Sequence, residues 1–343
     1  MANPLSTPPA EDKILSNGID PAQENSTLQE NGQPQPAQKS NTNAPTKPHP
    51  APAQSTAQEF LIEDHTTHPP LSAVTASLHQ KVTSFLSEPH DASTILYRVQ
   101  NQTRISLSVI QESLRRFSLH ELSLSYNGGK DCLVMLILFL ASLHPLPPAG
   151  TVNAGDDKTT PTPSTIPAIY AQPPHPFRSV EEFVASSSHT YHLSLVRYTT
   201  SPPTTTLRTA FASYLSLHPQ IRAIFVGTRR TDPHGEKLTH FDRTDHGWPD
   251  FVRIHPVIDW HYAEIWAFIR HLGIEYCPLY DEGYTSLGGT DDTHPNPKLK
   301  RGQQDSSSGV GDGADSTSEK KGDAAFRPAY ELMDDDEERL GRD

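Results

Sequence analysis

The feature that most constrains the fold is a glycine loop between an apolar strand and an apolar helix. The segment LSLSYNGGKDCLVMLILFLA (122–141) begins with the alternation typical of a strand and ends apolar on every side, as in a helix buried against a sheet. Gly128 and Gly129 permit unusual backbone angles and let a phosphate approach the main chain. This order predicts a phosphate site at the carboxyl end of a strand in an α/β sheet.

The rest of the chain repeats this alternation. Further strands are expected at 166–170, 193–198 and 221–226, and an extended segment at 251–258. Helices are expected at 71–87, 92–116, 179–189, 206–217 and 260–272, the last of which Asp259 could cap. The pattern predicts an α/β fold: a doubly wound, mostly parallel Rossmann-like sheet with helices on both faces.

Three segments have compositions typical of disorder. Residues 1–70 are rich in Pro, Gln, Asn, Ser and Thr, and the segments 144–165 and 300–323 are expected to be exposed inserts. Without them roughly 220 residues remain, which suits one domain spanning 71–343.

Composition narrows the class of protein. The net charge of −13 argues against a general affinity for nucleic acid or anionic membrane. The chain has two cysteines, Cys132 and Cys277, and so neither a disulfide framework nor the spacing of a zinc finger. It begins with no signal-like segment, and its most apolar run is too short to span a bilayer. We expect a soluble, cytoplasmic protein.

Charged residues in and after the loop indicate phosphate chemistry. Lys130 supplies a positive charge at the start of a helix, whose free amides also favour anions. A carboxylate beside a phosphate needs an intervening cation, so Asp131 is a candidate Mg²⁺ ligand. Arg229 and Arg230 follow a strand and could bind phosphate oxygens, with Asp232 in the next turn.

The motif SYNGGKD (125–131) after a strand resembles the pyrophosphatase-type loop of the adenine nucleotide α-hydrolases. The resemblance implies cleavage of ATP between the α- and β-phosphates. That group includes sulfonucleotide reductases, so the loop alone leaves the substrate open.

Motifs in the second half resemble those of eukaryotic FAD synthases, which are FMN adenylyltransferases. They are GTRRTDP (227–233), TDHGWP (244–249), PVIDWH (256–261), LYDEGYTSLGGTDDTHPNP (279–297) and FRPAYELMDDDEERLGR (326–342). Together with the loop they cover most of the chain from about residue 90 to residue 342.

This resemblance implies transfer of AMP from ATP to FMN, by in-line attack of the FMN phosphate on the α-phosphorus, giving FAD and pyrophosphate. It also implies a C-terminal extension over the site. The implied catalytic residues are Asn127, Asp131, Asp232 and Arg339, with Asp131 binding Mg²⁺. The implied ATP- and phosphate-binding residues are Ser125, Asn127, Gly128, Gly129, Lys130, Ile169, Gly227, Arg229, Arg230 and Arg342. The implied flavin-binding residues are Asp232, Trp248, Asp250, Arg253 and Asp259. We expect a monomer that could pass FAD to flavin-accepting apoproteins.

Three other functions remain open. A sulfonucleotide reductase needs a redox-active cysteine near the C-terminus, and residues 278–343 contain none. An RNA-modifying ATP pyrophosphatase would be expected to carry a basic stripe. A non-catalytic flavin or nucleotide sensor could retain the same motifs.

Overall fold

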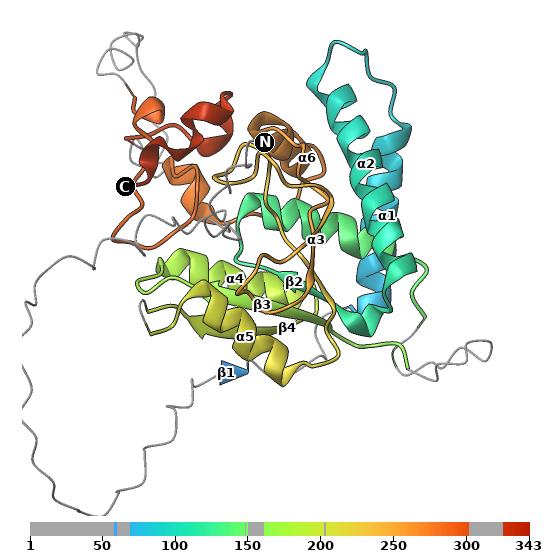
Figure 1. Ribbon diagram of the computed structural model, residues 1–343. Helices are drawn as coiled ribbons and strands as arrows, with labels where there is room; N and C mark the ends of the chain where they lie inside the picture. Colours follow the sequence, from blue (N-terminus) through green and yellow to red (C-terminus); the bar gives the residue numbers. More distant parts are fainter. Residues whose placement is uncertain (1–57, 60–68, 148, 150–160, 202–203, 302–324) are drawn as a thin grey trace, which may run out of the picture.

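The computed structural model describes residues 58–59, 69–147, 149, 161–201, 204–301 and 325–343. At its centre is a seven-stranded sheet in the order β1-β4-β3-β2-β5-β7-β6 (Figure 1). The five inner strands are parallel: β2 (Leu122–Ser125), β3 (Ile166–Gln172), β4 (Leu193–Thr199), β5 (Ala223–Phe225) and β7 (Val252–Ile254). The edge strands β1 (Gln58–Glu59) and β6 (Phe241–Arg243) pair antiparallel. The predicted mostly parallel α/β sheet is confirmed.

Helices cover both faces of the sheet. They are α1 (Leu71–Ser87), α2 (Ile95–Arg116), α3 (Lys130–Ser142), α4 (Arg178–Thr190), α5 (Leu207–Leu217) and α6 (Tyr262–His271). In β5, Ala223 and Phe225 join the hydrophobic core with α1, α2, α3, α4 and α6, while Ile224 joins a second core with α5. Because successive strand residues point to opposite faces, both faces are buried.

Helix α3 is buried on all sides. It packs against α1, α2 and α6 (Figure 1), and every residue from Cys132 to Ala141 is at most 3% exposed. This burial explains why its sequence is apolar all round, without the polar stripe of a surface helix.

Most predicted elements are present with shifted ends, but one predicted cap is wrong. The helix expected at 260–272 is Tyr262–His271, and its N-cap is His261. The His261 N–H donates to the Glu264 carboxylate at 3.0 Å. Asp259 lies too early to cap it and instead pairs with Arg230.

The helix expected at 92–116 begins at Ile95, because Thr94 is its N-cap and accepts a hydrogen bond from the Tyr97 N–H. The extended segment expected at 251–258 shortens to β7.

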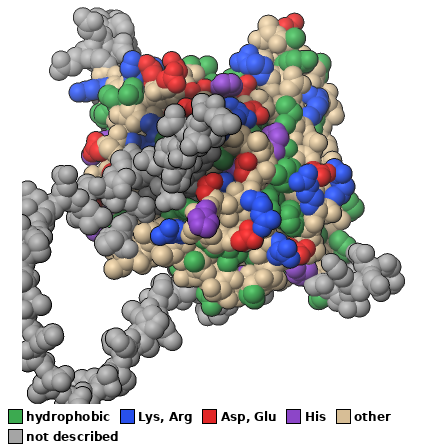
Figure 2. Space-filling model, in the orientation of Figure 1, with side chains coloured by type: hydrophobic (Ala, Val, Ile, Leu, Met, Phe, Trp, Pro, Cys, Tyr) green, Lys and Arg blue, Asp and Glu red, His purple; other side chains and the backbone are tan. Residues whose placement is uncertain are grey.

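The segments expected to be disordered fall largely outside the described residues. Within 1–70, Gln58–Glu59 forms the edge strand β1. Among the described residues, no helix combines the length and apolar character needed to cross a bilayer. On the face shown in Figure 2, basic and acidic side chains are interspersed.

The C-terminal segment is built of short 3-10 helices. They include η3 (Pro278–Glu282), η4 (Pro297–Leu299), η5 (Ala329–Glu331) and η6 (Asp335–Gly341). The Asn296 amide donates to the Glu337 carbonyl at 2.7 Å, and the Tyr262 N–H donates to Asp335 at 2.6 Å. These bonds hold η6 over the carboxyl end of the sheet.

Candidate active site

The loop after β2 has the tight geometry that its glycines predict. Gly128 has φ of +76°, and a Cβ there would lie 2.8 Å from a methyl group of Val184. The Gly129 N–H donates to the Asn127 side chain at 2.9 Å, which closes the turn. A larger residue at position 128 would therefore meet both backbone strain and a clash.

Lys130 is the first residue of α3, and its side chain is 2% exposed. Its backbone N–H donates to the Tyr280 hydroxyl at 2.9 Å, and its Nζ pairs with Asp131 at 3.0 Å and also with Glu338. Burial alone would lower the pKa of Lys130, but Asp131 and Glu338 raise it above its usual value. Lys130 is therefore a buried positive charge.

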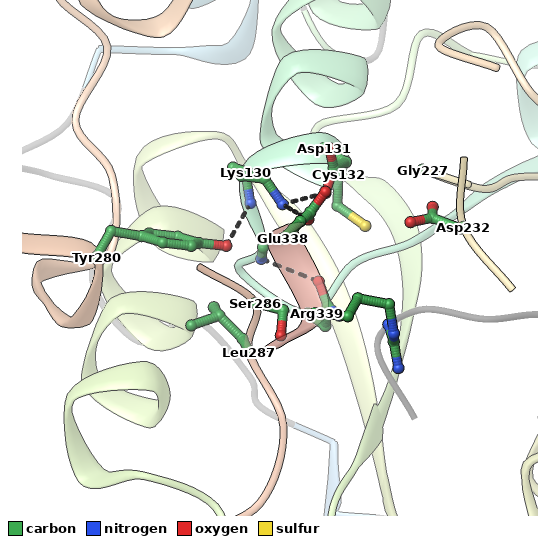
Figure 3. A pocket seen from close by; sticks show the side chains of 12 residues that line it. Lys130, Asp131, Cys132, Gly227, Asp232, Tyr280, Ser286, Leu287, Glu338 and Arg339 are labelled. Carbon is green, nitrogen blue, oxygen red and sulfur yellow. Dashed lines mark hydrogen bonds and ion pairs between the residues drawn. The ribbon is translucent and has the colours of Figure 1, made fainter. Parts of the chain in front are cut away.

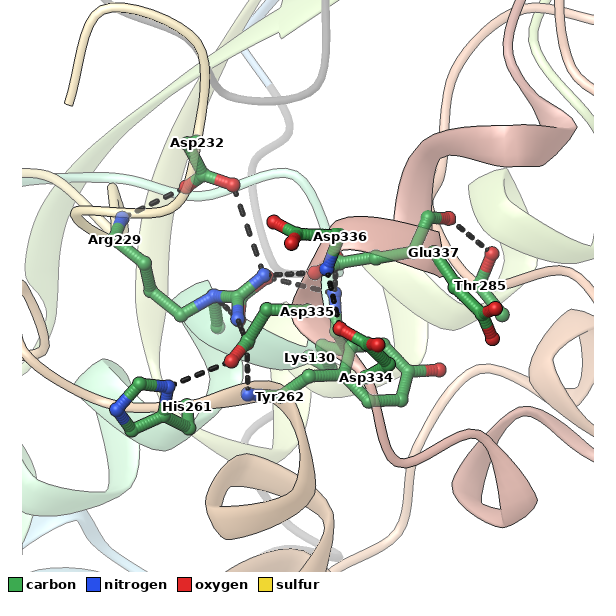
Figure 4. A network of polar contacts seen from close by, with 12 residues as sticks. Lys130, Arg229, Asp232, His261, Tyr262, Thr285, Asp334, Asp335, Asp336 and Glu337 are labelled. Atoms are coloured by element: carbon green, nitrogen blue, oxygen red, sulfur yellow. Dashed lines mark hydrogen bonds and ion pairs between the residues drawn. The ribbon is translucent and has the colours of Figure 1, made fainter. Parts of the chain in front are cut away.

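Arg229, which follows β5, is the centre of a buried ion network (Figure 4). Its guanidinium lies 2.8 Å from Asp131, 3.1 Å from Asp335 and 3.7 Å from Asp232, and it also pairs with Glu338. Because all four partners are acidic, the pKa of Arg229 is raised well above its usual value even though burial lowers it. Direct contact of Arg229 with phosphate stays a prediction.

The pKa values of the two aspartates beside Arg229 are shifted in opposite directions. Burial raises the pKa of Asp131, but Arg229 and Lys130 outweigh it and hold the pKa below its usual value. Burial raises the pKa of Asp232 to about 6, because Arg229 offsets burial only in part while Asp131 and Glu338 add repulsion. The lowered pKa keeps the Asp131 carboxylate ionised, which suits it to bind a cation.

A cavity of about 40 Å³ lies beside this network (Figure 3). Its lining comes from the loop, the residues after β5, η3, 286–287 and η6: Asn127, Gly129, Lys130, Asp131, Cys132, Gly227, Asp232, Tyr280, Ser286, Leu287, Glu338 and Arg339. A Cβ on Gly227 would lie 2.8 Å from both the backbone nitrogen and the sulfur of Cys132. The chain leaving β5 therefore passes directly against the start of α3.

Two other predicted phosphate-binding residues, Arg230 and Arg342, lie outside the lining of the cavity and form ion pairs of their own. Arg230 pairs with Asp259 at 2.7 Å, and both are 42% exposed. The Arg342 guanidinium is 2% exposed, pairs with Asp292 at 3.1 Å and donates to the Leu287 carbonyl at 3.1 Å.

Two further predicted ATP contacts lie in the central strands. Ser125 is buried at the end of β2. The side chain of Ile169 packs in the core beneath α5, and its carbonyl accepts a hydrogen bond from the Tyr126 N–H. Ile169 is fully buried, so its contact with an adenine stays a prediction.

The structure brings one predicted flavin contact, Asp232, to the cavity; the others lie outside its lining. Trp248 packs edge-on against Phe211 of α5, with ring centroids 6.4 Å apart. Asp250 pairs with Arg243 on the surface, and Arg253 lies 3.5 Å from Asp245. Their contact with a flavin stays a prediction.

Several residues of the site were missed from the sequence. Glu338, Asp335, Tyr280 and Ser286 all contact the ion network or line the cavity. The acidic run DDDEE (334–338) is typical of a solvated surface, and no local pattern indicates that two of its carboxylates bind a buried arginine.

The fold and the loop place the chain in the class of proteins built on a phosphoadenosine phosphosulfate reductase domain, whose family model matches residues 121–295. A probable FAD synthase of Schizosaccharomyces pombe is 36% identical over 72% of this chain and 81% of the relative. The chain therefore belongs to the FAD synthase family. A flavin adenine dinucleotide synthase of Saccharomyces cerevisiae is also 36% identical, over 53% of this chain and 60% of the relative.

Solved structures agree with this family. The crystal structure of Candida glabrata FMN adenylyltransferase in complex with FMN and the ATP analogue AMPCPP is similar, with a TM-score of 0.67 and 27% identity. The match covers 80% of this chain and all of that one.

Proposed function

We propose that this protein transfers AMP from ATP to FMN, giving FAD and pyrophosphate. The observation that carries the proposal is the NGGKD loop, where a buried, charged lysine and an ionised aspartate meet at the start of α3. Membership of the FAD synthase family supports FMN as the acceptor.

The reaction is a direct in-line displacement. A phosphate oxygen of FMN attacks the α-phosphorus of ATP, the bond to the β-phosphate breaks, and pyrophosphate leaves with the bonding electrons. A phosphate is already an adequate nucleophile, so catalysis is positioning and neutralisation of charge. Lys130 supplies positive charge, Gly128 supplies a backbone amide, and Asn127 orders the loop by accepting the Gly129 N–H.

Asp131 fits the role of a Mg²⁺ ligand. Its Oδ1 is buried and accepts no hydrogen bond, although it lies 2.8 Å from the guanidinium of Arg229. A hard oxygen donor of this kind suits Mg²⁺, which would neutralise charge on the leaving pyrophosphate. Asp232 also pairs with Arg229 and lines the same cavity, so it would orient water bound to such an ion.

Substrate binding requires the C-terminal segment to move. A cavity of about 40 Å³ holds one or two water molecules, far less than a nucleotide. The Glu338 carboxylate contacts both Lys130 and Arg229, which is where a phosphate oxygen would be neutralised. Entry of ATP therefore exchanges this carboxylate for substrate phosphate, while Arg339 remains close enough to contact the substrate.

The flavin is assigned to the region between the end of β6 and the start of α6. Trp248 offers a half-buried ring, and Asp250, Arg253 and Asp259 offer polar groups for its edges. Asp232, which follows β5 and lines the cavity, would mark the boundary between the flavin and phosphate sites.

The nearest rival reaction is sulfonucleotide reduction. The last cysteine, Cys277, is fully buried, and burial raises its pKa to about 11. A thiol of this kind is a poor nucleophile. We assign the protein to the cytoplasm as a monomer that passes FAD to apoproteins, and expect no nucleic-acid partner.

The purified chain incubated with ATP, Mg²⁺ and FMN tests the assignment. We expect FAD and pyrophosphate to form in equal amounts, measured by chromatography and a pyrophosphate assay. Hydrolysis of ATP without FMN, or consumption of ATP without a flavin product, would contradict the proposed reaction.

A further inference from the structure

A second group of ligand-type side chains lies outside the catalytic cavity, where the connection from α1 to α2 meets the end of α6. The Glu88 Oε2 atom lies 3.0 Å from His90 Nε2 and 2.7 Å from His271 Nε2. The three ligand atoms lie within 4.8 Å of one another, and the described part of the chain has one such group. None of the three residues lines the cavity.

The backbone that carries Glu88 is fixed by buried hydrogen bonds. The side chain of Gln100, which is 3% exposed, donates to the Phe85 carbonyl at 2.7 Å and to the Glu88 carbonyl at 2.9 Å. The ring of Phe85 lies 6.2 Å from that of His90 and 5.1 Å from that of His271. The ligands are thus presented from an ordered junction, which lowers the entropy cost of binding an ion.

We propose that Glu88, His90 and His271 bind a divalent transition-metal ion of the Zn²⁺ type. Two imidazole nitrogens and one carboxylate are a donor set suited to Zn²⁺, whereas Mg²⁺ and Ca²⁺ prefer oxygen alone. The side chains are 39%, 17% and 29% exposed, in that order, so water can complete a four-coordinate site.

Small adjustments of the side chains would admit the ion. Ligand atoms about 2.0–2.1 Å from a tetrahedral Zn²⁺ lie roughly 3.3 Å apart, and the two measured separations here are 3.0 and 2.7 Å. Both Nε2 atoms donate to the Glu88 carboxylate here. Metal binding would replace these hydrogen bonds, with each ring proton on Nδ1 so that Nε2 presents its lone pair to the ion.

The neighbouring surface gives a path to the site. A hollow of about 410 Å³ is lined in part by Lys81, Ser84, Glu88 and His271. Lys81 donates to the Leu272 carbonyl at 3.1 Å, and its charge opposes a cation. We therefore expect affinity below that of a closed structural zinc site.

An ion here would join the α1–α2 connection to the C-terminal end of α6. Since only the folded chain holds the three ligands together, the ion should raise the melting temperature, and the rise should grow with the free ion concentration above the Kd. The FAD-forming reaction should be unaffected.

Zn²⁺ binding to the metal-free full chain tests the proposal. Titration of Zn²⁺ against a chromophoric chelator, with Mg²⁺ in excess to saturate oxygen sites, should show one Zn²⁺ ion bound per chain. The same Zn²⁺ should raise the melting temperature. His90→Gln and His271→Gln should each weaken binding at least about tenfold. Unchanged FAD synthesis by both variants would show that they are folded.

Two control variants separate this site from others. His79 stacks near His144, with ring centroids 4.8 Å apart, but its Nδ1 lies 3.1 Å from the Ala141 carbonyl. His79→Gln should still bind one Zn²⁺ ion per chain, and so should Asp131→Asn in the catalytic cavity. Binding lost in either control, or equal binding in wild type and His271→Gln, would overturn the proposal, as would the absence of a bound equivalent.

Discussion

Glu338 and Lys130 are 208 positions apart in the chain, yet their charged groups form a buried ion pair. The pair joins η6 to the first residue of α3, and the same carboxylate contacts Arg229. The C-terminal segment therefore supplies the negative charge that balances the phosphate-binding loop before substrate arrives.

Glu338→Gln should tighten ATP binding and weaken the fold. The carboxylate no longer competes with phosphate for Lys130 and Arg229, but its buried ion pairs are lost, at a cost of about 1–3 kcal/mol. Calorimetric ATP affinity and urea denaturation measure the two effects. Glu337→Gln is the matched control, because Glu337 pairs with Lys298 near the surface. Weaker ATP binding by Glu338→Gln would show that the carboxylate assists the substrate.

Asp131→Asn should lower kcat by about 10²–10⁴-fold, because the amide is a poor ligand for Mg²⁺. The side chain keeps its size, so the fold should remain. Steady-state FAD formation over a range of Mg²⁺ concentrations measures the effect. Asp291→Asn, at an exposed position, is the control and should have the kcat of the wild type. Near-normal turnover by Asp131→Asn would show that Asp131 is not a catalytic residue.

Arg229→Lys should destabilise the protein by about 3–5 kcal/mol, because an ammonium cannot serve four carboxylates at once. The adjacent Arg230→Lys should cost less than about 1 kcal/mol, since its pair with Asp259 is half exposed. Equilibrium unfolding of the two variants gives the comparison. Similar stabilities would mean that the Arg229 network contributes little to folding.

Arg339→Ala and Arg342→Ala should separate function from stability. Arg339 lines the cavity, so its loss should reduce kcat/KM by about 10-fold or more with little change in melting temperature. Arg342 is buried with Asp292, so its loss should lower the melting temperature as well. A lower melting temperature for Arg339→Ala, together with a lower kcat/KM alone for Arg342→Ala, would contradict these roles.

Asp232 should make stability fall as pH rises from about 4 to about 6.5. Its pKa of about 6 lies above the usual value of 3.8, so the folded state binds more protons than the unfolded state in this window. The stability it contributes is present below pH 4 and lost as pH rises through 6. Urea denaturation at about pH 4 and about pH 6.5 measures the effect. Between these two pH values, the free energy of unfolding should fall by about 1–3 kcal/mol more in wild type than in Asp232→Asn. Equal losses would contradict the raised pKa.

The sequence predicts the sheet and the loop because both depend on local patterns. Short apolar segments between helical patterns indicated the strands, and the apolar run after Lys130 indicated a helix buried against the sheet. The helix start at His261 was missed because Asp259 is the better cap by residue type, whereas Glu264 makes His261 the observed start.

The ion network could not be predicted because it depends on contacts across the fold. Asp335 and Glu338 belong to an acidic run that would be solvated on its own. They are buried here because Arg229 and the start of α6 supply donors for them. From the sequence, Trp248 was a candidate flavin neighbour with core packing as the alternative, and in the structure its ring packs against Phe211.

Labelled ATP gives the most direct test of AMP transfer at this loop. With FMN and Mg²⁺, the label of α-phosphate-labelled ATP should appear in FAD, and that of γ-phosphate-labelled ATP in pyrophosphate. Both transfers should fall together in Lys130→Met. Release of the γ-label as orthophosphate, or of the α-label as free AMP in place of FAD, would contradict cleavage between the α- and β-phosphates by attack of FMN.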